Sequence, residues 1–348
     1  MKDHNENVNT ENIAGTTPGS MPDPSYIPFE KRLDLSGLQQ KMDAVRQEIK
    51  KVIIGQDEMI DLLLVTLLTG GHALIEGVPG TAKTITAKLL ARTIRAPFSR
   101  IQFTPDLMPS DIIGTSVLNL KTNEFEFKKG PIFAQIVLID EINRAPAKTQ
   151  SALFECMAEN QVTADGLTYS LPLPFAVFAT QNPVEHEGTY RLPEAQLDRF
   201  LFKIEIKYPS LDEEIKILEE QNKLENTRKE DLAQEVLNAG EVAGFQQLVN
   251  RIFVHEQLLQ YIARIVDQTR NNSSLILAAS PRASIALLRS AKAFAALNGR
   301  DFITPEDVKQ VAMPVLGHRV MIAPEKELEG LDAERVIQQI IDMVEIPR

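Results

Sequence analysis

The chain has few of the features that mark secreted, membrane-spanning or metal-cluster proteins. Its 348 residues include a single cysteine, Cys156, so neither an intrachain disulfide nor a thiolate metal cluster can form. No apolar run approaches the roughly 20 residues that a membrane span needs. The first 24 residues lack the apolar core of a signal peptide. We therefore expect a protein of a reducing cytoplasm, without direct membrane insertion, whose residues 1–31 form a disordered tail.

Positive charge is also scarce. The chain has 37 Lys and Arg against 48 Asp and Glu, which gives a formal net charge of −11. An acidic surface argues against general affinity for nucleic acid, because phosphate backbones are bound by clustered basic side chains. Cys156 lies in a helix-like pattern, and we interpret it as a buried small apolar residue rather than a reactive thiol. The length is typical of two domains.

The strongest positive signal is a glycine-containing loop between an apolar run and a helical pattern. Its sequence is Gly77-Val78-Pro79-Gly80-Thr81-Ala82-Lys83-Thr84. Glycines allow backbone N–H groups to turn around phosphate oxygens, Lys83 would reach the β- and γ-phosphates, and the Thr84 hydroxyl would ligate Mg²⁺. Ala82 stands where the usual pattern has glycine. We expect this change to matter little, because Gly77 and Gly80 still permit close approach of the backbone.

Alternating strand and helix patterns predict an α/β fold. Helical spacing begins at the loop and also covers residues 33–54 and 59–68. Strands are expected at 72–75, 99–103, 135–140, 174–180 and 200–206. Continuous apolar runs are typical of parallel strands that are covered on both faces. We predict a doubly wound parallel-sheet core over 32–208, with ligands at the carboxyl ends of its strands.

The remainder, residues 209–348, has the composition of an all-helical domain. Helix caps are predicted at Ser210, Ser280 and Thr304. Two insertions interrupt the core before this point. One covers 106–130 and contains a hairpin-like stretch, and the other covers 161–173 with an Asp165-Gly166 turn.

Polar residues follow two of the predicted buried strands. Asp140, at a strand end, can hold Mg²⁺ through water, and Glu141 can act as base or orient the attacking water. Asn182 follows the next strand, where its amide can hold a water or a γ-phosphate oxygen; the alternative is a turn residue before Pro183. Together with the loop, these residues favour hydrolysis of a nucleoside triphosphate.

The chain resembles the MoxR branch of the AAA+ ATPases from about residue 35 to the end. The matching strings are 77–84, 103–111, 130–133, 140–146, 179–183, 192–200 and 280–283. A small residue such as Ala82 is usual beside the loop lysine in that family. The resemblance implies an AAA+ core followed by a helical lid domain. It also implies that Ile54 and Gly55 pack on adenine.

The resemblance implies further roles in catalysis. Asn182 is then the first sensor, and Arg282 is a second sensor that the lid brings back to the γ-phosphate. Arg199 is the arginine finger that is donated to a neighbouring subunit. Arg144 and Arg191 are rival fingers, and a salt bridge with Asp198 or Glu194 is the structural alternative for Arg199.

A finger that acts in trans needs a head-to-tail interface, which closes into a ring or continues into a filament. The family implies a homo-hexamer that hydrolyses Mg·ATP to remodel or mature a partner protein, often one with a von Willebrand factor A domain. The two insertions would face the ring pore or the partner. Two other functions remain open at this point: a DNA-acting AAA+ motor, and a nucleotide-gated adaptor that binds ATP without turnover.

Overall fold

The structure is a computed structural model, and it describes residues 32–347 apart from 79, 184–188, 191 and 224–228. The chain from Leu33 onward forms one compact unit. The tail predicted for residues 1–31 lies outside the described residues. None of the described helices is long and apolar enough to cross a membrane.

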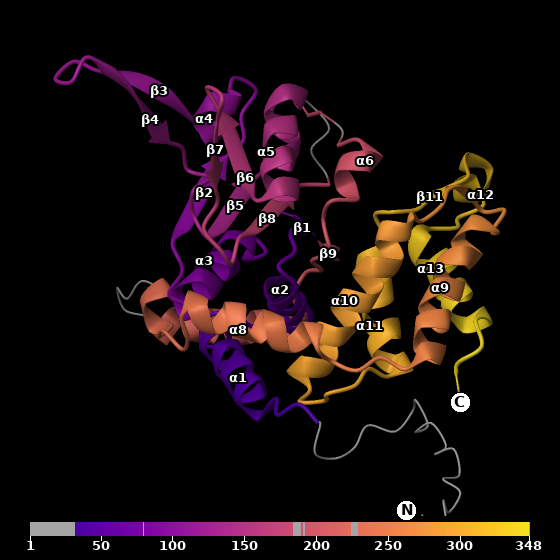
Figure 1. Cartoon of the computed structure of the whole chain (residues 1–348). Helices are drawn as coiled ribbons and strands as arrows, with labels where there is room; N and C mark the ends of the chain where they lie inside the picture. The colour runs from indigo at the N-terminus through magenta and orange to yellow at the C-terminus, as the bar shows by residue number, and fades with distance from the viewer. Residues whose placement is uncertain (1–31, 79, 184–188, 191, 224–228, 348) are drawn as a thin grey trace, which may run out of the picture. The chain divides into compact units, whose positions relative to one another are not determined.

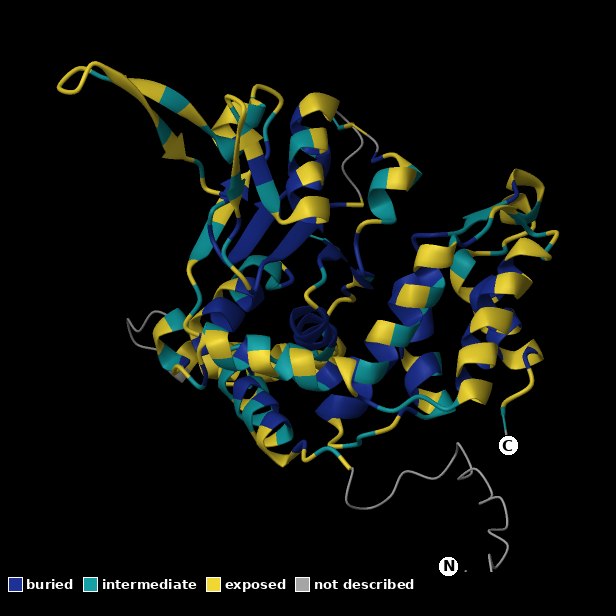
Figure 2. Ribbon diagram, viewed as in Figure 1, coloured by how far each residue is buried: buried dark blue, intermediate teal, exposed yellow. Residues whose placement is uncertain are grey.

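A five-stranded parallel sheet forms the centre of the first half (Figure 1). Its strands are β1 (Ala73–Glu76), β2 (Phe98–Gln102), β5 (Ile136–Asp140), β8 (Ala176–Gln181) and β9 (Phe202–Glu205), in the order β2-β5-β8-β1-β9. These are the five strands that the sequence predicted. Every residue of β5 is buried, as expected for a strand covered on both faces (Figure 2).

Apolar side chains of the sheet divide between two hydrophobic clusters. Ile136 and Leu138 of β5 join the cluster that includes α1 (Ser36–Lys50), α2 (Asp57–Thr69) and α3 (Lys83–Thr93). The alternate residues Val137 and Ile139 join the other cluster, with α4 (Pro109–Ile113) and α5 (Ala147–Glu159). Successive side chains of a strand point to opposite faces, so helices cover both sides of the sheet, as the prediction of a doubly wound fold requires.

Both insertions form antiparallel hairpins. The first is β3 (Gly114–Asn119) with β4 (Glu124–Lys129), which extends away from the sheet in Figure 1. The second is β6 (Gln161–Ala164) with β7 (Leu167–Ser170). Its turn residues Asp165 and Gly166 have φ values of 51° and 77°. Positive φ at both turn positions matches the twist of the flanking strands, which confirms the predicted Asp-Gly turn.

The C-terminal part is helical but also contains a small sheet. Its elements are α7 (Leu211–Lys223), η3 (Lys229–Leu232), α8 (Ala239–Asn250), α9 (Glu256–Arg270), β10 (Leu275–Leu277), α10 (Pro281–Leu297), α11 (Pro305–Leu316), β11 (Met321–Ile322), α12 (Pro324–Leu328) and α13 (Ala333–Met343). The antiparallel pair β10–β11 departs from the all-helical prediction. Strands this short are visible only once they pair, because two or three residues carry no periodicity. The boundary at 208/209 stays a prediction.

Candidate functional site

The phosphate loop lies between β1 and the N-terminus of α3. A Cβ on Gly77 would come within 3.1 Å of the Ile206 side chain, so glycine gives the closest fit at this position. Gly80 has φ +85° and open space around it, which leaves its backbone accessible. The Lys83 ammonium donates a hydrogen bond to the Gly77 carbonyl oxygen. The lysine therefore already points into the concave side of the loop, where phosphate oxygens would bind.

Ala82 shares with Gly80 the positive φ that the sequence argument assigned to the glycines alone. It caps α3 with φ 62° and ψ 14°, in the left-handed region. An L-residue with a Cβ is strained there by about 1–2 kcal/mol, whereas glycine is not. Ala82 therefore adds backbone strain, and the expectation that it matters little for nucleotide binding stays a prediction.

Three neighbouring strands bring the acidic and polar residues to the same edge of the sheet as the loop. The Thr84 hydroxyl lies 3.4 Å from Asp140 Oδ1 at the end of β5. Thr180 of β8 donates to the same carboxylate oxygen at 3.2 Å and accepts from the Glu141 N–H at 3.0 Å. Asn182 is buried one residue after β8. The structure thus assembles the predicted constellation at the carboxyl ends of β1, β5 and β8.

The edge strand β2 contributes two residues that the sequence argument missed. Arg100 Nε lies 2.5 Å from Asp140 Oδ2, and Gln102 Nε2 donates to Glu141 Oε2 at 2.7 Å. Arg100 and Gln102 are two positions apart on a strand, so they lie on one face, and the register pairs Gln102 with Asp140. The alternation of polar residues near the end of β2 was the signal that could have revealed them.

Glu141 is held in a strained position. Its φ of 59° is in the left-handed region, which is uncommon for a residue with a side chain. Besides Gln102, its carboxylate faces Arg144 Nε at 3.1 Å. Arg144, a rival for the arginine finger, thus pairs with the glutamate of its own subunit. Such strain clusters at functional sites, where the surrounding structure holds the residue in place.

The donor set fits Mg·ATP. The Thr84 hydroxyl and the Asp140 carboxylate are neighbouring oxygen ligands, the kind that Mg²⁺ prefers when phosphates supply the rest of its coordination. No group of three or more His, Cys, Asp or Glu side chains among the described residues could hold a metal ion alone. A cavity of about 310 Å³ lies beside Gly55 and is lined also by Tyr208 and by Met313 of α11. Ile54, half-buried, precedes it.

The two candidate arginines lie at the opposite edge of the sheet. Arg199 and Arg282 line a cavity of about 350 Å³ with Gly71 and His72, which precede β1. The phosphate loop follows β1, and a four-residue strand spans about 13 Å. Arg282 thus lies near the amino ends of the strands, and its role as a second sensor stays a prediction. Arg191 lies outside the described residues.

Among the described contacts of Asp198, the alternative salt bridge with Arg199 is not present. Its side chain is exposed and donates from Nη1 to the Phe154 carbonyl oxygen at 3.1 Å. Asp198 pairs instead with Arg319 at 2.8 Å and faces Arg282 at 3.6 Å. The role of Arg199 as an arginine finger stays a prediction.

Buried ionisable groups outside the loop have structural roles. Burial raises the pKa of the Cys156 thiol to about 12, so the thiol stays protonated, which confirms its interpretation as an inert core residue. Burial also lowers the pKa of His72 to about 4.

The fold and the site together define an α/β nucleotide-binding ATPase with a helical lid. The family model "ATPase family associated with various cellular activities (AAA)" matches residues 72–202, and an AAA lid domain matches 267–340. Chaperone MoxR1 of Mycobacterium tuberculosis is 44% identical over 310 residues, which cover 86% of this chain and 81% of that protein. The uncharacterized protein YeaC of Bacillus subtilis is 46% identical over 301 residues, covering 86% and 93%.

A solved structure agrees with these relatives. The crystal structure of a candidate ATPase from Cytophaga hutchinsonii matches with a TM-score of 0.83 and 44% identity, covering 90% of this chain and 97% of that one. The chain belongs to the MoxR family of AAA+ ATPases. Binding and hydrolysis of ATP are the activities of that family.

Proposed function

We propose that the chain hydrolyses Mg·ATP at the interfaces of a homo-hexameric ring, in the cytoplasm, and uses the energy to remodel or mature a partner protein. The observation that carries the proposal is the separation of the two halves of the site. The loop and acids lie at the carboxyl edge of the sheet, while Arg199 and Arg282 lie near its amino edge. Cations near that side of the sheet would fit a neighbour's nucleotide.

A head-to-tail arrangement satisfies both halves at once. We call the side with the phosphate loop the loop edge and the side with Arg199 and Arg282 the arginine edge. Each subunit presents its loop edge to one neighbour and its arginine edge to the other. Such heterologous contacts close into a ring when the rotation between subunits allows it. Transition-state charge on the phosphoryl group is then compensated only in the assembly. Arg282 would serve the neighbour's nucleotide together with Arg199.

The loop-side residues have distinct chemical tasks. Backbone N–H groups of 77–84 and the Lys83 ammonium would hold the phosphates, and Thr84 and Asp140 would hold Mg²⁺. A bound Mg²⁺ would neutralise phosphate charge. Glu141 would accept a proton from the attacking water, which Asn182 helps to orient.

The Glu141 carboxylate has two polar neighbours, and both contact one of its oxygens. Gln102 Nε2 donates to Oε2 of Glu141, and Arg144 Nε faces the same oxygen at 3.1 Å. Exchange of one of these contacts for water would switch the residue from a paired to a catalytic state. Its strained backbone makes such a shift less costly.

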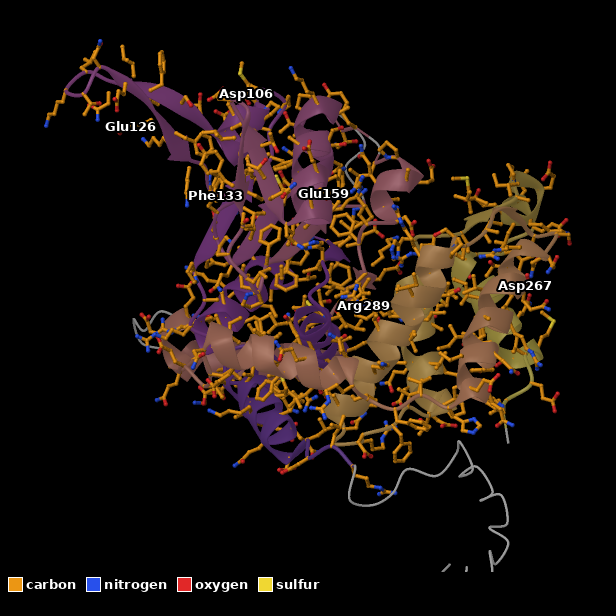
Figure 3. All side chains as sticks on the ribbon, in the orientation of Figure 1. Asp106, Glu126, Phe133, Glu159, Asp267 and Arg289 are labelled. Atoms are coloured by element: carbon orange, nitrogen blue, oxygen red, sulfur yellow. The ribbon has the colours of Figure 1, made fainter. Side chains whose placement is uncertain are left out.

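The two hairpins are the proposed contact surface for the partner. Leu120 and Phe125 of the first hairpin are 87% and 75% exposed. At its base, Phe127 stacks on Tyr169 of the second hairpin with ring centroids 4.4 Å apart. Phe133, labelled in Figure 3, packs edge-on against both rings. Apolar residues at the end of a braced arm fit contact with a protein, and we propose a partner with a von Willebrand factor A domain.

The test is the variant Glu141→Gln in the full chain. We expect ATP to bind with unchanged affinity while steady-state hydrolysis falls by about 10²–10⁴-fold, because the amide cannot accept the proton. Lys83→Ala is the control that loses binding itself. Light scattering with ATP would report the ring, and the trapped Glu141→Gln assembly would retain the partner for identification.

Two results would redirect the proposal. Undiminished hydrolysis by Glu141→Gln contradicts the role of Glu141. DNA that binds with strong salt dependence and stimulates turnover would favour a DNA-acting motor. Steady turnover by the unmodified protein would exclude an adaptor that only binds nucleotide.

A further inference from the structure

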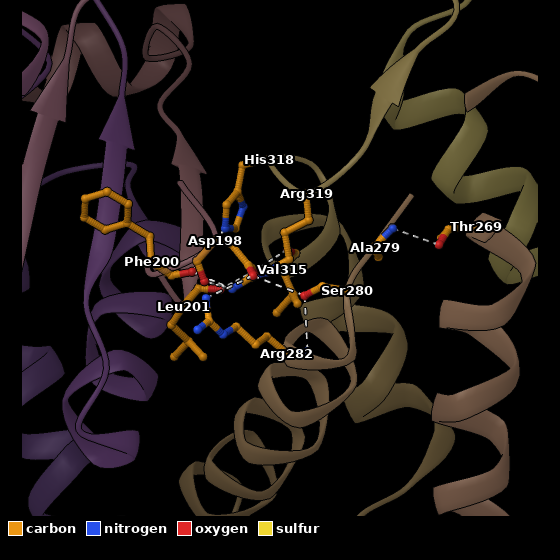
Figure 4. Close-up of polar contacts among 10 residues, drawn as sticks. All are labelled: Asp198, Phe200, Leu201, Thr269, Ala279, Ser280, Arg282, Val315, His318 and Arg319. Atoms are coloured by element: carbon orange, nitrogen blue, oxygen red, sulfur yellow. Dashed lines mark hydrogen bonds and ion pairs between the residues drawn. The ribbon is translucent and has the colours of Figure 1, made fainter. Parts of the chain in front are cut away.

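Arg319 lies in the turn after α11, and its guanidinium is buried at the junction of the lid and the core. Its side chain is 3% exposed. Nε donates to Asp198 Oδ1 at 2.8 Å, and Nη2 donates to the carbonyl oxygens of Asp198 and Phe200 at 3.2 and 2.6 Å. Nη1 donates to the carbonyls of Leu201 and Val315. All five N–H donors of the guanidinium are therefore used (Figure 4).

These bonds fix a short segment of the core against the lid. Residues 198–201 precede β9, while Arg319 and Val315 belong to the lid. His318, also buried, binds the Phe200 carbonyl oxygen through Nε2 at 3.1 Å. A buried arginine whose hydrogen bonds are complete is strongly oriented, because loss of any acceptor would leave a buried N–H donor unsatisfied.

The second carboxylate oxygen of Asp198 binds a different lid helix. Ser280, the N-cap of α10, donates to Oδ2 at 3.1 Å, and Arg282 Nη1 lies 3.6 Å from the same atom. Figure 4 shows Asp198 between Arg319 on one side and Ser280 with Arg282 on the other. One carboxylate thus links the end of α11, the start of α10 and the segment before β9.

Arg199 follows Asp198 directly in the chain. Arg319 therefore sets the position of both exposed cations: Arg199 through the backbone of 198–201, and Arg282 through the shared carboxylate. We propose that Arg319 is a positioning residue for ATP hydrolysis, which holds Arg199 and Arg282 at the spacing needed to act on a neighbour's nucleotide. This inference rests on the proposed function.

The chemistry of the contact requires arginine. Lysine offers three donors from one atom and cannot reach acceptors spread around a planar fork. Arg319→Lys keeps the charge and most of the volume but loses the geometry. We expect this variant to lower kcat at least 10-fold while KM for ATP changes less than 3-fold, because its own loop is untouched.

Mixing of variant subunits gives a measurement, the recovered ATPase activity, that a purely structural role of Arg319 would not change. Arg319→Lys is defective on its arginine edge, and Lys83→Ala is defective on its loop edge. In an equal, random mixture about one interface in four pairs an intact loop with an intact arginine edge, so about a quarter of wild-type activity should return. Glu141→Gln mixed with Lys83→Ala is the matched control, since both defects lie on the loop edge and no interface is intact.

One further mixture separates the inference from the proposed function. Arg199→Ala with Lys83→Ala should also recover activity. If it recovers and the Arg319→Lys mixture does not, the role of Arg319 is refuted while the shared interface stands. If neither recovers, the shared interface itself is refuted, and the inference falls with it.

Asp198→Asn decides the matter if Arg319→Lys does not fold. The amide keeps an acceptor for the guanidinium and nearly the same shape, but it removes the charge that Arg319 and Arg282 share. We expect a lower kcat and recovery in the mixture with Lys83→Ala. A normal kcat in folded Asp198→Asn would overturn the proposal. The proposal would also be overturned if activity failed to recover when Asp198→Asn is mixed with Lys83→Ala but did recover in the Arg199→Ala mixture.

Discussion

His72 lies just before β1 and lines the same cavity as Arg199 and Arg282. We expect it to lower the stability of the fold in acid. Its ring nitrogens have fixed partners: Nδ1 accepts from the Val177 N–H at 3.0 Å, and Nε2 donates to the Met157 carbonyl oxygen at 3.0 Å. A second proton on Nδ1 would face the N–H donor and break that bond. The ring is buried, and burial lowers its pKa to about 4, against 6.5 in the unfolded chain.

The sign and size of the effect follow from these two values. Below pH 6.5 the unfolded chain takes up a proton at His72 and the folded chain does not, so stability is lost as pH falls and is complete above pH 6.5. The difference of about 2.5 pKa units corresponds to about 3.4 kcal/mol in full, of which about 2 kcal/mol is lost by pH 5. The pKa of His318 is lowered in the same direction, chiefly by burial, and adds to the loss.

The assay is urea unfolding of wild type and His72→Asn between pH 7.5 and 5. The Asn oxygen can still accept from Val177 but does not titrate in this range. We expect the variant to be less stable at pH 7.5, by about 1–3 kcal/mol for the lost Met157 contact and packing, and the gap to shrink by about 2 kcal/mol at pH 5. His255→Asn, at the half-buried cap of α9, is the matched control. An unchanged gap for His72→Asn would refute the reasoning.

Three further predictions concern the phosphate loop, the proposed Mg²⁺ ligand Asp140 and the hairpins. Ala82→Val should lower the free energy of unfolding by more than about 1 kcal/mol and weaken binding of a fluorescent nucleotide, because a β-branched residue is disfavoured at positive φ. Ala82→Gly should retain both stability and nucleotide binding. Equal behaviour of the two variants would contradict the backbone strain at this position. Arg100→Met should lower the Mg²⁺ concentration needed for half-maximal nucleotide binding by about 2–5-fold. The variant removes a half-exposed guanidinium that competes with Mg²⁺ for the Asp140 carboxylate. An unchanged Mg²⁺ titration would argue against this competition. Tyr169→Ala removes a stacking interaction with Phe127 worth about 1 kcal/mol. Proteolysis at the first hairpin should therefore accelerate about 5-fold, while basal ATP hydrolysis stays unchanged. Equal cleavage rates would show that the stacked rings do not stabilise the hairpin.

Most of the sheet could be predicted because its signals are local. Strands such as β5 are continuous apolar runs, and the Asp165-Gly166 turn has its own backbone preference. The pair β10–β11 could not be predicted, since Leu275 and Ile322 meet only through the packing of helices between them. The pairing of Arg100 with Asp140 likewise depends on the register of two parallel strands.

The sequence by itself determined the chemistry of the loop edge. Glycines, a lysine and a hydroxyl in one short segment define a phosphate site, and Asp140 follows a strand that must end at the same edge of a parallel sheet. Only the tertiary structure decided where the arginines lie. Arg199 and Arg282 belong to distant segments that Asp198 and Arg319 bring together at the opposite edge. Hydrogen bonds between distant segments leave no local pattern in the sequence, so the dependence on a neighbouring subunit could be argued in geometric terms only from the folded chain.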